Sequence, residues 1–328
     1  MRSAMVTGVA GMIGSHLLDE LIARGYRVLG VDNLTYGKLE NIEQHLSNPN
    51  FTLHRVDIED LDALRILARD VDMIVHLAAV KKTNEAQSNM RTLTVNAKGT
   101  ENVFEVGKMW SKKVVYASTS DVYGMTPELP FREDGNILLG TSTIKRWAYA
   151  VSKLYGEHLA FSYASDFGLK VVVIRYFGGF SPRSSFSWSG GHIPIFINAV
   201  LNDEEVPIHG DGNQTRSMAF VNDLVSGTVM AMENERAVGE IINLGSAEEM
   251  SVIESARLIH RLAKTGKELR LKMIPMEEVF GQYRDIMRRI PDLSKAKRLL
   301  GYEPKYSTRD AIQITLDEVK KRRSSKTK

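Results

Sequence analysis

The sequence predicts an α/β protein with a doubly wound parallel sheet and a smaller C-terminal substrate-binding lobe. Three observations predict this fold. A glycine-rich turn near the N-terminus lies between an apolar strand and an amphipathic helix, strands and helices then alternate through the first half, and this alternation becomes irregular in the second half. A regular strand–helix alternation indicates parallel strands joined by helical crossovers, with ligands at the carboxyl ends of the strands.

The glycine turn follows a predicted buried strand at 4–7 and precedes a predicted helix at 15–22. Its spacing is GxxGxxG, and its residues are Gly8, Gly11, Met12, Ile13 and Gly14. Glycines here allow conformations and close approaches that a Cβ would block, so that a phosphate reaches the backbone N–H groups at the helix start. The turn therefore predicts a dinucleotide site on a sheet of the Rossmann type.

The second and third strands, predicted at 26–31 and 51–56, each end at an acidic residue. Asp32 stands about 20 residues beyond the turn, where a carboxylate accepts both ribose hydroxyls and repels a 2′-phosphate, which favours NAD over NADP. Lys38 keeps NADP open, and Asp32 beginning only a turn is the alternative. Further along, the Asp57 carboxylate can accept from the adenine amino group.

The remaining elements of the first half continue the alternation. We predict a helix at 61–67, a strand at 71–79, a helix at 96–110 and a strand at 114–118. The fourth strand ends in Leu77, Ala78 and Ala79, and small residues there let the backbone pass close to a flat ligand. His76 is predicted to be a packed strand-end residue rather than a catalyst.

The residues with reactive side chains follow the fifth strand. Ser118, Thr119, Ser120 and Asp121 leave that strand at the cofactor edge, and a helix at 149–166 begins with Tyr149 and carries Lys153. Positions i and i+4 share one helical face, and an adjacent ammonium favours the phenolate, so we expect Lys153 to lower the pKa of Tyr149 and make it a base. An ordinary surface pair is the alternative, which the nucleotide fold and the Ser/Thr-rich strand end disfavour.

Together these motifs resemble the extended short-chain dehydrogenase/reductase family of nucleotide-sugar epimerases and dehydratases. The match includes the glycine turn, the acidic strand ends, His76 to Ala79, Ser118 to Gly124 and the Tyr149/Lys153 pair. It extends almost to the end of the chain through Asn96 to Thr100, Arg175-Tyr176-Phe177, Gly210 to Arg216 and Asp292 to Lys297. The resemblance implies an NAD cofactor, a nucleotide-sugar substrate and a homodimer built on the helices at 96–110 and 149–166.

The resemblance also implies individual roles. Tyr149 would take the proton of the sugar 4-hydroxyl while hydride passes from C4 to nicotinamide, Lys153 would hold the nicotinamide ribose, and Thr119 would share the 4-oxygen. Arg216, with Arg288 or Arg289, would contact the nucleotide diphosphate, which suits a planar guanidinium; an exposed loop charge is the alternative for Arg216. The implied cofactor set also includes Asn33, Ile58, Asn96, Ser118 and Tyr176, and the implied substrate set includes Thr119, Gly178, His192 and Ile208.

Three departures from the family pattern leave the substrate open. Gly178 and Gly179 stand where relatives usually carry an amide, and Lys145-Arg146-Trp147 replaces a common proline. A Ser/Gly-rich loop at 184–191, with Trp188, could cover the sugar.

The residues after Thr119 should decide the reaction that follows C4 oxidation. Dehydratases and related decarboxylases typically have Glu before Val/Leu-Tyr-Gly, and this chain has Asp121 there, with Ser120 where some dehydratases have an acid. We therefore favour a 4,6-dehydratase acting on a UDP-sugar such as UDP-GlcNAc or UDP-glucose, with Asp121 removing the C5 proton. A 4-epimerase, in which Asp121 only caps a turn, is the main alternative. Decarboxylation, C5 epimerisation, 4-keto reduction and a catalytically silent NAD-binding regulator remain further alternatives.

The domain prediction follows from these elements. Residues 1–176 form the NAD-binding domain, with returns near 218–244, and 177–217 and 245–320 form the substrate lobe. Residues 321–328 are predicted to be a basic disordered tail, because six of the last nine side chains are basic; the net charge of +3 therefore gives no reason to expect a nucleic-acid partner. With no cysteine, no apolar run near 18 residues and no room for a signal peptide, we expect a cytoplasmic protein without a metal site or membrane partner.

Overall fold

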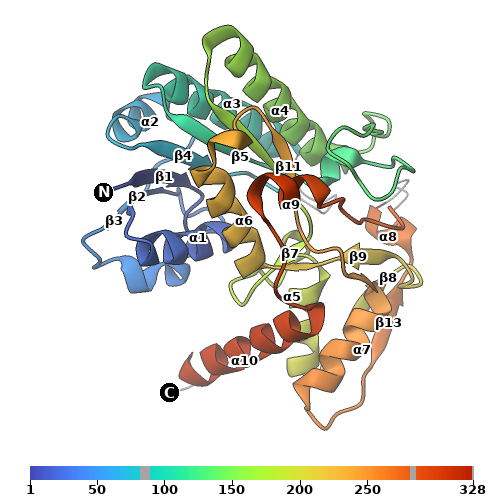
Figure 1. The fold of residues 1–328 in the computed structure, drawn as a ribbon. Coiled ribbons are helices and arrows are strands. Elements are labelled where there is room, and N and C mark those ends of the chain that lie inside the picture. The colour runs from blue at the N-terminus through green and yellow to red at the C-terminus, as the bar shows by residue number, and fades with distance from the viewer. Residues whose placement is uncertain (82–88, 281–285, 327–328) are drawn as a thin grey trace.

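A parallel sheet of seven strands forms the centre of the molecule (Figure 1). The computed structural model describes residues 1–81, 89–280 and 286–326. The strand order is β11-β6-β5-β4-β1-β2-β3, and every neighbouring pair is parallel. The strands are β1 (Ser3–Thr7), β2 (Arg27–Val31), β3 (Phe51–His54), β4 (Met73–His76), β5 (Lys113–Thr119), β6 (Val171–Tyr176) and β11 (Ile241–Leu244). The chain crosses from β3 back past β1 to β4, so the sheet is doubly wound, as predicted.

Helices cover both faces of this sheet (Figure 1). One face packs against α1 (Met12–Ala23) and α6 (Val221–Glu233), and the other against α2 (Leu61–Ala68), α3 (Asn89–Met109) and α4 (Trp147–Phe167). Consecutive strand residues point to opposite faces, so Ala4 and Val6 join one core while Met5 joins the other. Both faces are therefore buried, which explains the near-continuous apolar runs of these strands.

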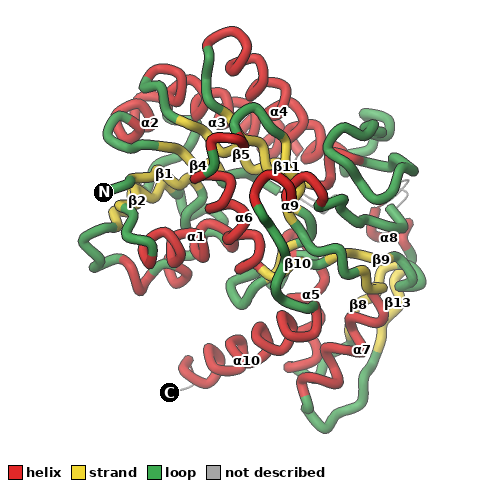
Figure 2. The backbone as a smooth tube through the Cα atoms, in the orientation of Figure 1, coloured by secondary structure: helices red, strands yellow, loops and turns green. Residues whose placement is uncertain are grey.

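The smaller lobe is built from the irregular second half (Figure 2). Three two-stranded pairs form there: β7 (Gly179–Phe180) with β10 (Ala219–Phe220), β8 (Val206–His209) with β13 (Leu271–Ile274), and β9 (Thr215–Ser217) with β12 (Glu249–Ser251). The helices that follow β6, apart from α6, are α5 (His192–Leu201), α7 (Val252–Ala263), α8 (Met276–Phe280), α9 (Ser294–Leu300) and α10 (Thr308–Lys326). Strand β11 lies at the edge of the central sheet beside β6, so the chain passes through the smaller lobe and returns to the sheet.

The structure corrects the predicted C-terminal tail. Residues 321–326 continue helix α10 instead of forming a disordered segment. Lys320 Nζ donates to the carbonyl of Ala263 at 2.9 Å, and Arg323 donates to Asn198 and Asn202, each at 2.7 Å. Two of the basic side chains that suggested a solvated tail, Lys320 and Arg323, thus hold the end of α10 against α7 and α5.

Element boundaries also shift by several residues. Helix α1 begins at Met12, before the predicted start at 15, and α3 begins at Asn89, before 96. Strand β4 ends at His76, so Leu77 to Ala79 already belong to the loop that lines the cofactor edge. His76 is fully buried between Thr7 and Thr100, 2.7 and 3.1 Å from their hydroxyls, in the packed position that the sequence predicts.

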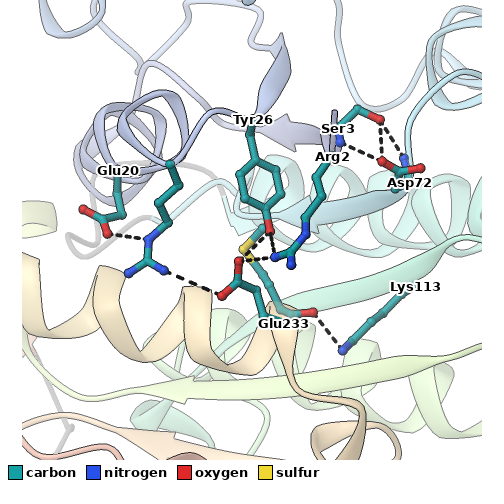
Figure 3. A network of polar contacts seen from close by, with 9 residues as sticks. Arg2, Ser3, Glu20, Tyr26, Asp72, Lys113 and Glu233 are labelled. Atoms are coloured by element: carbon teal, nitrogen blue, oxygen red, sulfur yellow. Dashed lines mark hydrogen bonds and ion pairs between the residues drawn. The ribbon is translucent and has the colours of Figure 1, made fainter.

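A polar network joins the elements at the opposite end of the sheet (Figure 3). Glu233, at the end of α6, accepts from Arg2 at 2.6 Å and from the Tyr26 hydroxyl at 2.8 Å. Lys113, at the start of β5, donates to the Met232 carbonyl at 2.9 Å. The Lys113 bond satisfies one of the last carbonyls of α6, and together these bonds join the end of α6 to the start of the sheet strands.

Among the described helices, none combines the length and the apolar composition that crossing a bilayer requires.

Candidate active site

A cleft of about 530 Å³ lies at the carboxyl edge of the sheet. Most of the residues that the sequence singled out line it. Toward the cofactor these are Gly8, Gly11, Met12, Ile13, Gly14, Asp32, Asn33, Asp57, Ile58, Leu77, Ala78, Ala79, Ser118 and Tyr176; toward the substrate lobe they are Thr119, Ser120, Asp121, Tyr149, Lys153, Gly178, His192, Arg216 and Arg289. Segments far apart in the chain therefore meet at one edge, where ligands of doubly wound folds bind.

The glycine turn fits a dinucleotide diphosphate. A Cβ at Gly14 would lie 2.1 Å from the carbonyl oxygen of Gly8, so only glycine lets the helix start so close to the strand. Gly8 itself has φ +73°, a conformation that side chains disfavour. The turn therefore leaves the N–H groups at the start of α1 open toward the cleft, as an anion site requires.

The acidic strand ends lie in the same cleft. Asp32 is buried and accepts from the backbone N–H groups of Ala10, at 3.0 Å, and Leu34, at 2.8 Å. Burial raises the pKa of this carboxyl, while those two hydrogen bonds oppose the rise. Asn33 donates to Asp57 at 2.8 Å, which fixes both side chains beside the ribose end of the cleft. This arrangement fits the adenosine half of NAD.

Tyr149 and Lys153 lie in the first two turns of α4, below β5. Lys153 Nζ donates to the carbonyl of Ala117 at 2.8 Å and lies 4.9 Å from the ring centre of Tyr116. Burial lowers the pKa of Lys153 to about 7, against the opposing charge of Glu157. Burial, followed by the charge of Asp121, raises the pKa of Tyr149. The expected lowering of the tyrosine pKa by Lys153 is thus absent in the free protein, because the phenol is desolvated and faces a carboxylate.

A buried ion pair lies one turn beyond Lys153. Glu157 accepts two hydrogen bonds from Arg175, at 2.9 and 2.7 Å, and a third from the Ser118 hydroxyl. Both ion-pair side chains are less than 5% exposed, at 3% for Arg175 and 4% for Glu157. The Arg175 guanidinium also lies 4.7 Å from the Tyr123 ring centre. This pair connects α4 and β6 beneath the cleft.

Asp121 is surrounded by cationic groups. Arg146 lies 3.1 Å from its Oδ1, Arg289 binds the same oxygen, and the charge of Lys81 acts on it as well. Burial opposes ionisation of Asp121, but these three cations outweigh burial and hold its pKa far below the usual range. A carboxylate with so low a pKa is a weak base, which does not suit the predicted removal of a C5 proton.

The substrate side of the cleft explains one departure from the family pattern. A Cβ at Gly178 would lie 2.6 Å from the Met218 sulfur, so Met218 occupies the space that an amide side chain would need. His192 begins α5, and burial followed by the charge of Arg216 lowers its pKa to about 3, so it is neutral. Arg216 donates to the carbonyls of Thr215 and Ile286, both at 2.8 Å.

Three predicted residues lie outside the cleft lining. Asn96 is buried behind it and exchanges hydrogen bonds with the Val80 backbone, at 2.7 and 3.0 Å, so it holds the cleft loop. Ile208 is fully buried in the core of the smaller lobe. Arg288 is exposed and pairs with Glu249 at 2.8 Å instead of turning inward beside Arg289. The structure gives none of the three a direct contact with the cleft.

The sequence interpretation missed three cationic residues. Lys81 and Arg183 line the cleft, and Arg146 pairs with Asp121. The Lys81 ammonium lies 5.8 Å from the Tyr149 ring centre. Two signals were available: Arg146 stands one helical turn before Tyr149, and Lys81 directly follows the small-residue loop after the fourth strand.

Comparisons with known proteins identify the family of this chain. The family model described as GDP-mannose 4,6 dehydratase matches residues 5–315. The UDP-N-acetyl-alpha-D-glucosaminuronate decarboxylase of Bacillus cytotoxicus is 37% identical, over 96% of this chain and 97% of that protein. UDP-glucuronic acid decarboxylase 2 of Arabidopsis thaliana is 34% identical, over 97% of this chain and 68% of that protein.

A solved structure matches as well. The UDP-glucuronic acid 4-epimerase of Bacillus cereus, in complex with UDP-glucuronic acid and NAD, superposes with a TM-score of 0.87 at 30% identity, covering 97% of this chain and 99% of the epimerase. The glycine turn, the acidic strand ends and the Tyr149/Lys153 pair thus belong to a fold that binds NAD in a solved relative. The chain is a member of the GDP-mannose 4,6 dehydratase family, within the extended short-chain dehydrogenases/reductases, and its cofactor is NAD.

Proposed function

We propose that this protein is an NAD-dependent decarboxylase of a UDP-hexuronate, a nucleotide sugar whose C6 is a carboxylate. The observation that carries the proposal is the pairing of Asp121 with both Arg146 and Arg289. This pairing makes Asp121 a poor base, and it leaves more positive than negative charge beside Tyr149.

The charge favours an anionic sugar. Lys81, Arg146 and Arg289 contribute three cations near one carboxylate, Asp121. Arg289 Nε is buried and has no hydrogen-bond partner within the described part of the chain, so its guanidinium still has a donor to offer. A sugar carboxylate would take such a donor and compensate the excess charge, whereas the neutral 6-hydroxymethyl group of UDP-glucose would leave that charge unpaired.

The weak basicity of Asp121 favours decarboxylation over dehydration. Elimination of a 6-hydroxyl needs a base to remove the C5 proton. In a 4-keto hexuronate, cleavage of the C5–C6 bond itself releases CO2 and leaves the electron pair at C5, stabilised by the C4 carbonyl. No base is needed for that step. A proton then takes the place of the lost carboxylate at C5, which becomes a CH2 group, and the hydride removed from C4 returns to C4.

The proposed roles of the chain's own residues follow from their positions. Tyr149 takes the proton of the 4-hydroxyl and later returns one, Thr119 holds the 4-oxygen, and Lys153 binds the nicotinamide ribose. Bound NAD supplies the hydride acceptor, and its positive charge offsets the burial that raises the pKa of Tyr149. Arg216 contacts the UDP diphosphate. In this scheme Asp121 orients Arg146 and Arg289 rather than transferring a proton.

A 4-epimerase acting on the same class of substrate is the second candidate. It is supported by the structural likeness to the Bacillus cereus UDP-glucuronic acid 4-epimerase, and it too needs no C5 base. The decarboxylase is preferred because the relatives at 37% and 34% identity are decarboxylases and because Asp121 occupies the acidic position that decarboxylases of this family typically carry.

The test is incubation of the NAD-loaded protein with UDP-glucuronate, UDP-N-acetylglucosaminuronate, UDP-glucose and UDP-GlcNAc in D2O, followed by NMR. We expect CO2 and a UDP-pentose, or its 2-acetamido analogue, from one hexuronate. A product that keeps C6 and is inverted at C4 would identify the epimerase. A 4-keto-6-deoxy product from UDP-glucose or UDP-GlcNAc would instead restore the dehydratase interpretation, and no turnover of any sugar would favour the silent regulator.

We also propose that the protein is a homodimer. Helices α3 and α4 pack side by side and expose large apolar residues near their N-terminal ends: Met90 is 65% exposed, Leu93 37%, Val151 45% and Tyr155 46%. Exposed apolar residues gathered on adjacent helices are typical of an interface. Light scattering coupled to gel filtration should give twice the 36.7 kDa of the chain, and Tyr155→Glu should shift the mass toward one chain.

A further inference from the structure

The loop that begins the substrate lobe after β7, residues 181–191, packs against the cofactor half of the molecule. The Ser184 hydroxyl donates to the sulfur of Met12, in the glycine turn, at 3.0 Å. Arg183 Nη2 lies 2.7 Å from Asp19 Oδ2 on helix α1, and the Arg183 side chain is only 12% exposed. Two adjacent loop residues thus contact the first helix at two separate points.

Asp19 is held firmly on its own side. His45 and Gln44 donate to its Oδ1 at 2.7 and 2.9 Å, while Arg183 binds Oδ2. Burial opposes ionisation of Asp19, but Arg183 and these hydrogen bonds outweigh burial and hold its pKa below the usual range. The carboxylate is therefore a fixed anchor for Arg183 on α1.

The same loop forms part of the cleft wall. Arg183, Ser185, Gly190 and Gly191 line the cleft, and Trp188 packs on His209 with ring centres 3.8 Å apart and ring planes tilted by 31°, which fixes the far end of the loop. A diphosphate bound at the start of α1 would lie in the part of the cleft that this loop borders. Release of the loop from α1 would open that part of the cleft.

We propose that Arg183, paired with Asp19, is a positioning residue that keeps NAD bound throughout turnover by holding loop 181–191 against helix α1. The reaction scheme needs such retention, because the hydride taken from the sugar must return to a sugar from the same cofactor molecule. Arg183 acts through the loop and transfers no proton. The inference concerns cofactor retention alone and stands whichever sugar is the substrate.

The test measures bound NAD and its dissociation rate in Arg183→Met and Asp19→Asn. We expect each variant to release NAD about tenfold faster, the factor that corresponds to about 1.4 kcal/mol. Arg24→Met is the matched control, because Arg24 pairs with Glu20 and Glu233 at the other end of α1, at 2.6 and 3.6 Å. Arg24→Met should release NAD at the wild-type rate.

Thermal unfolding of the NAD-free forms separates retention from a general loss of stability. The proposal is supported if Arg183→Met and Arg24→Met lose similar stability but only Arg183→Met releases NAD faster. It is overturned if NAD leaves Arg183→Met at the wild-type rate, or if the two variants release NAD equally fast. Because the readout is bound NAD, failure of the decarboxylase proposal would leave this result unchanged.

Discussion

Replacing Glu157 with Gln tests whether the buried ion pair beneath the cleft holds the site together. Glu157 receives three hydrogen bonds, two from Arg175 and one from Ser118, and Arg175 and Glu157 are 3% and 4% exposed. Glutamine keeps the size of the side chain but leaves the Arg175 charge uncompensated. One of the two oxygens that now accept hydrogen bonds is then replaced by an N–H₂ group, so at least one bond is lost as well as a charge.

The expected cost follows from this burial. Removing one partner of a buried, hydrogen-bonded ion pair costs about 3–5 kcal/mol, because the remaining charge stays desolvated. Glu20→Gln is the control: Glu20 pairs with Arg24 at a similar distance, 2.6 Å, but the two side chains are 38% and 44% exposed. An exposed pair of that kind contributes about 0.2–1 kcal/mol.

The assay is urea unfolding of the NAD-free protein, followed by circular dichroism, for wild type and both variants. Glu157→Gln should lose several times more free energy of unfolding than Glu20→Gln. A second consequence is specific to Glu157: its charge raises the pKa of Lys153, so the substitution should move that pKa below about 7, and the stability change that Lys153 causes should begin at correspondingly lower pH. If both variants lower the free energy of unfolding by less than about 1 kcal/mol, then loss of the Glu157 charge does not leave Arg175 as an unpaired buried charge, and the reasoning from the geometry fails.

Three further predictions concern the cleft. Burial lowers the pKa of Lys153 to about 7 in the folded protein, so between that pH and about 10.4 the unfolded chain binds more protons than the folded one. The free energy of unfolding should therefore rise with pH across this window. Lys153→Met should flatten the rise measured from pH 7 to 10. Asp121→Asn removes a negative charge that raises the pKa of Tyr149, so that pKa should fall. An ultraviolet titration of tyrosinate measures it, and Tyr149→Phe assigns the signal. An unchanged titration would contradict the proximity of the two groups. Gly14→Ala places a Cβ 2.1 Å from the Gly8 carbonyl oxygen and should abolish NAD retention in equilibrium dialysis. Gly239→Ala is the control: nothing lies within 4 Å of its Cβ, but its φ of +81° disfavours a side chain, so it should lower stability and still bind NAD.

The fold was predictable because its signals are local. The glycine turn, the acidic ends of β2 and β3 and the spacing of Tyr149 and Lys153 each depend on neighbouring residues, and parallel strands bring all their carboxyl ends to one edge. The cofactor half could therefore be located without any knowledge of the smaller lobe. The helical end of α10 was less accessible, since it depends on Arg323 reaching Asn198 and Asn202, more than 120 positions earlier.

The environment of the site was not predictable in the same way. Asp121 stands at a position typical of an acid or base, and nothing nearby in the sequence indicates its state of charge. That state is set by Arg146, 25 positions away, and Arg289, 168 positions away. Likewise, Lys153 was expected to lower the pKa of Tyr149, but burial of the phenol and the Asp121 carboxylate dominate in the free protein.

These two corrections bear on one chemical choice. Under the proposed function, oxidation at C4 makes a ketone that can lose a C5 proton, lose a C6 carboxylate or rotate and be reduced again, and we expect the residue that faces C5 and C6 to select among them. A free carboxylate at that place would favour proton removal. Asp121 is instead fixed between two guanidinium groups, so its basicity is lost and its charge serves to orient cations. Cations held near C6 stabilise a substrate carboxylate on binding, and their interaction with it weakens as CO2 leaves. Pairing of Arg289 with the sugar carboxylate would therefore favour binding of a hexuronate but oppose the loss of CO2. Firm pairing of Arg289 with Asp121 would reduce that opposition, so under the proposed function the ratio of pentose to epimerised hexuronate measures how firmly Asp121 retains its two arginines.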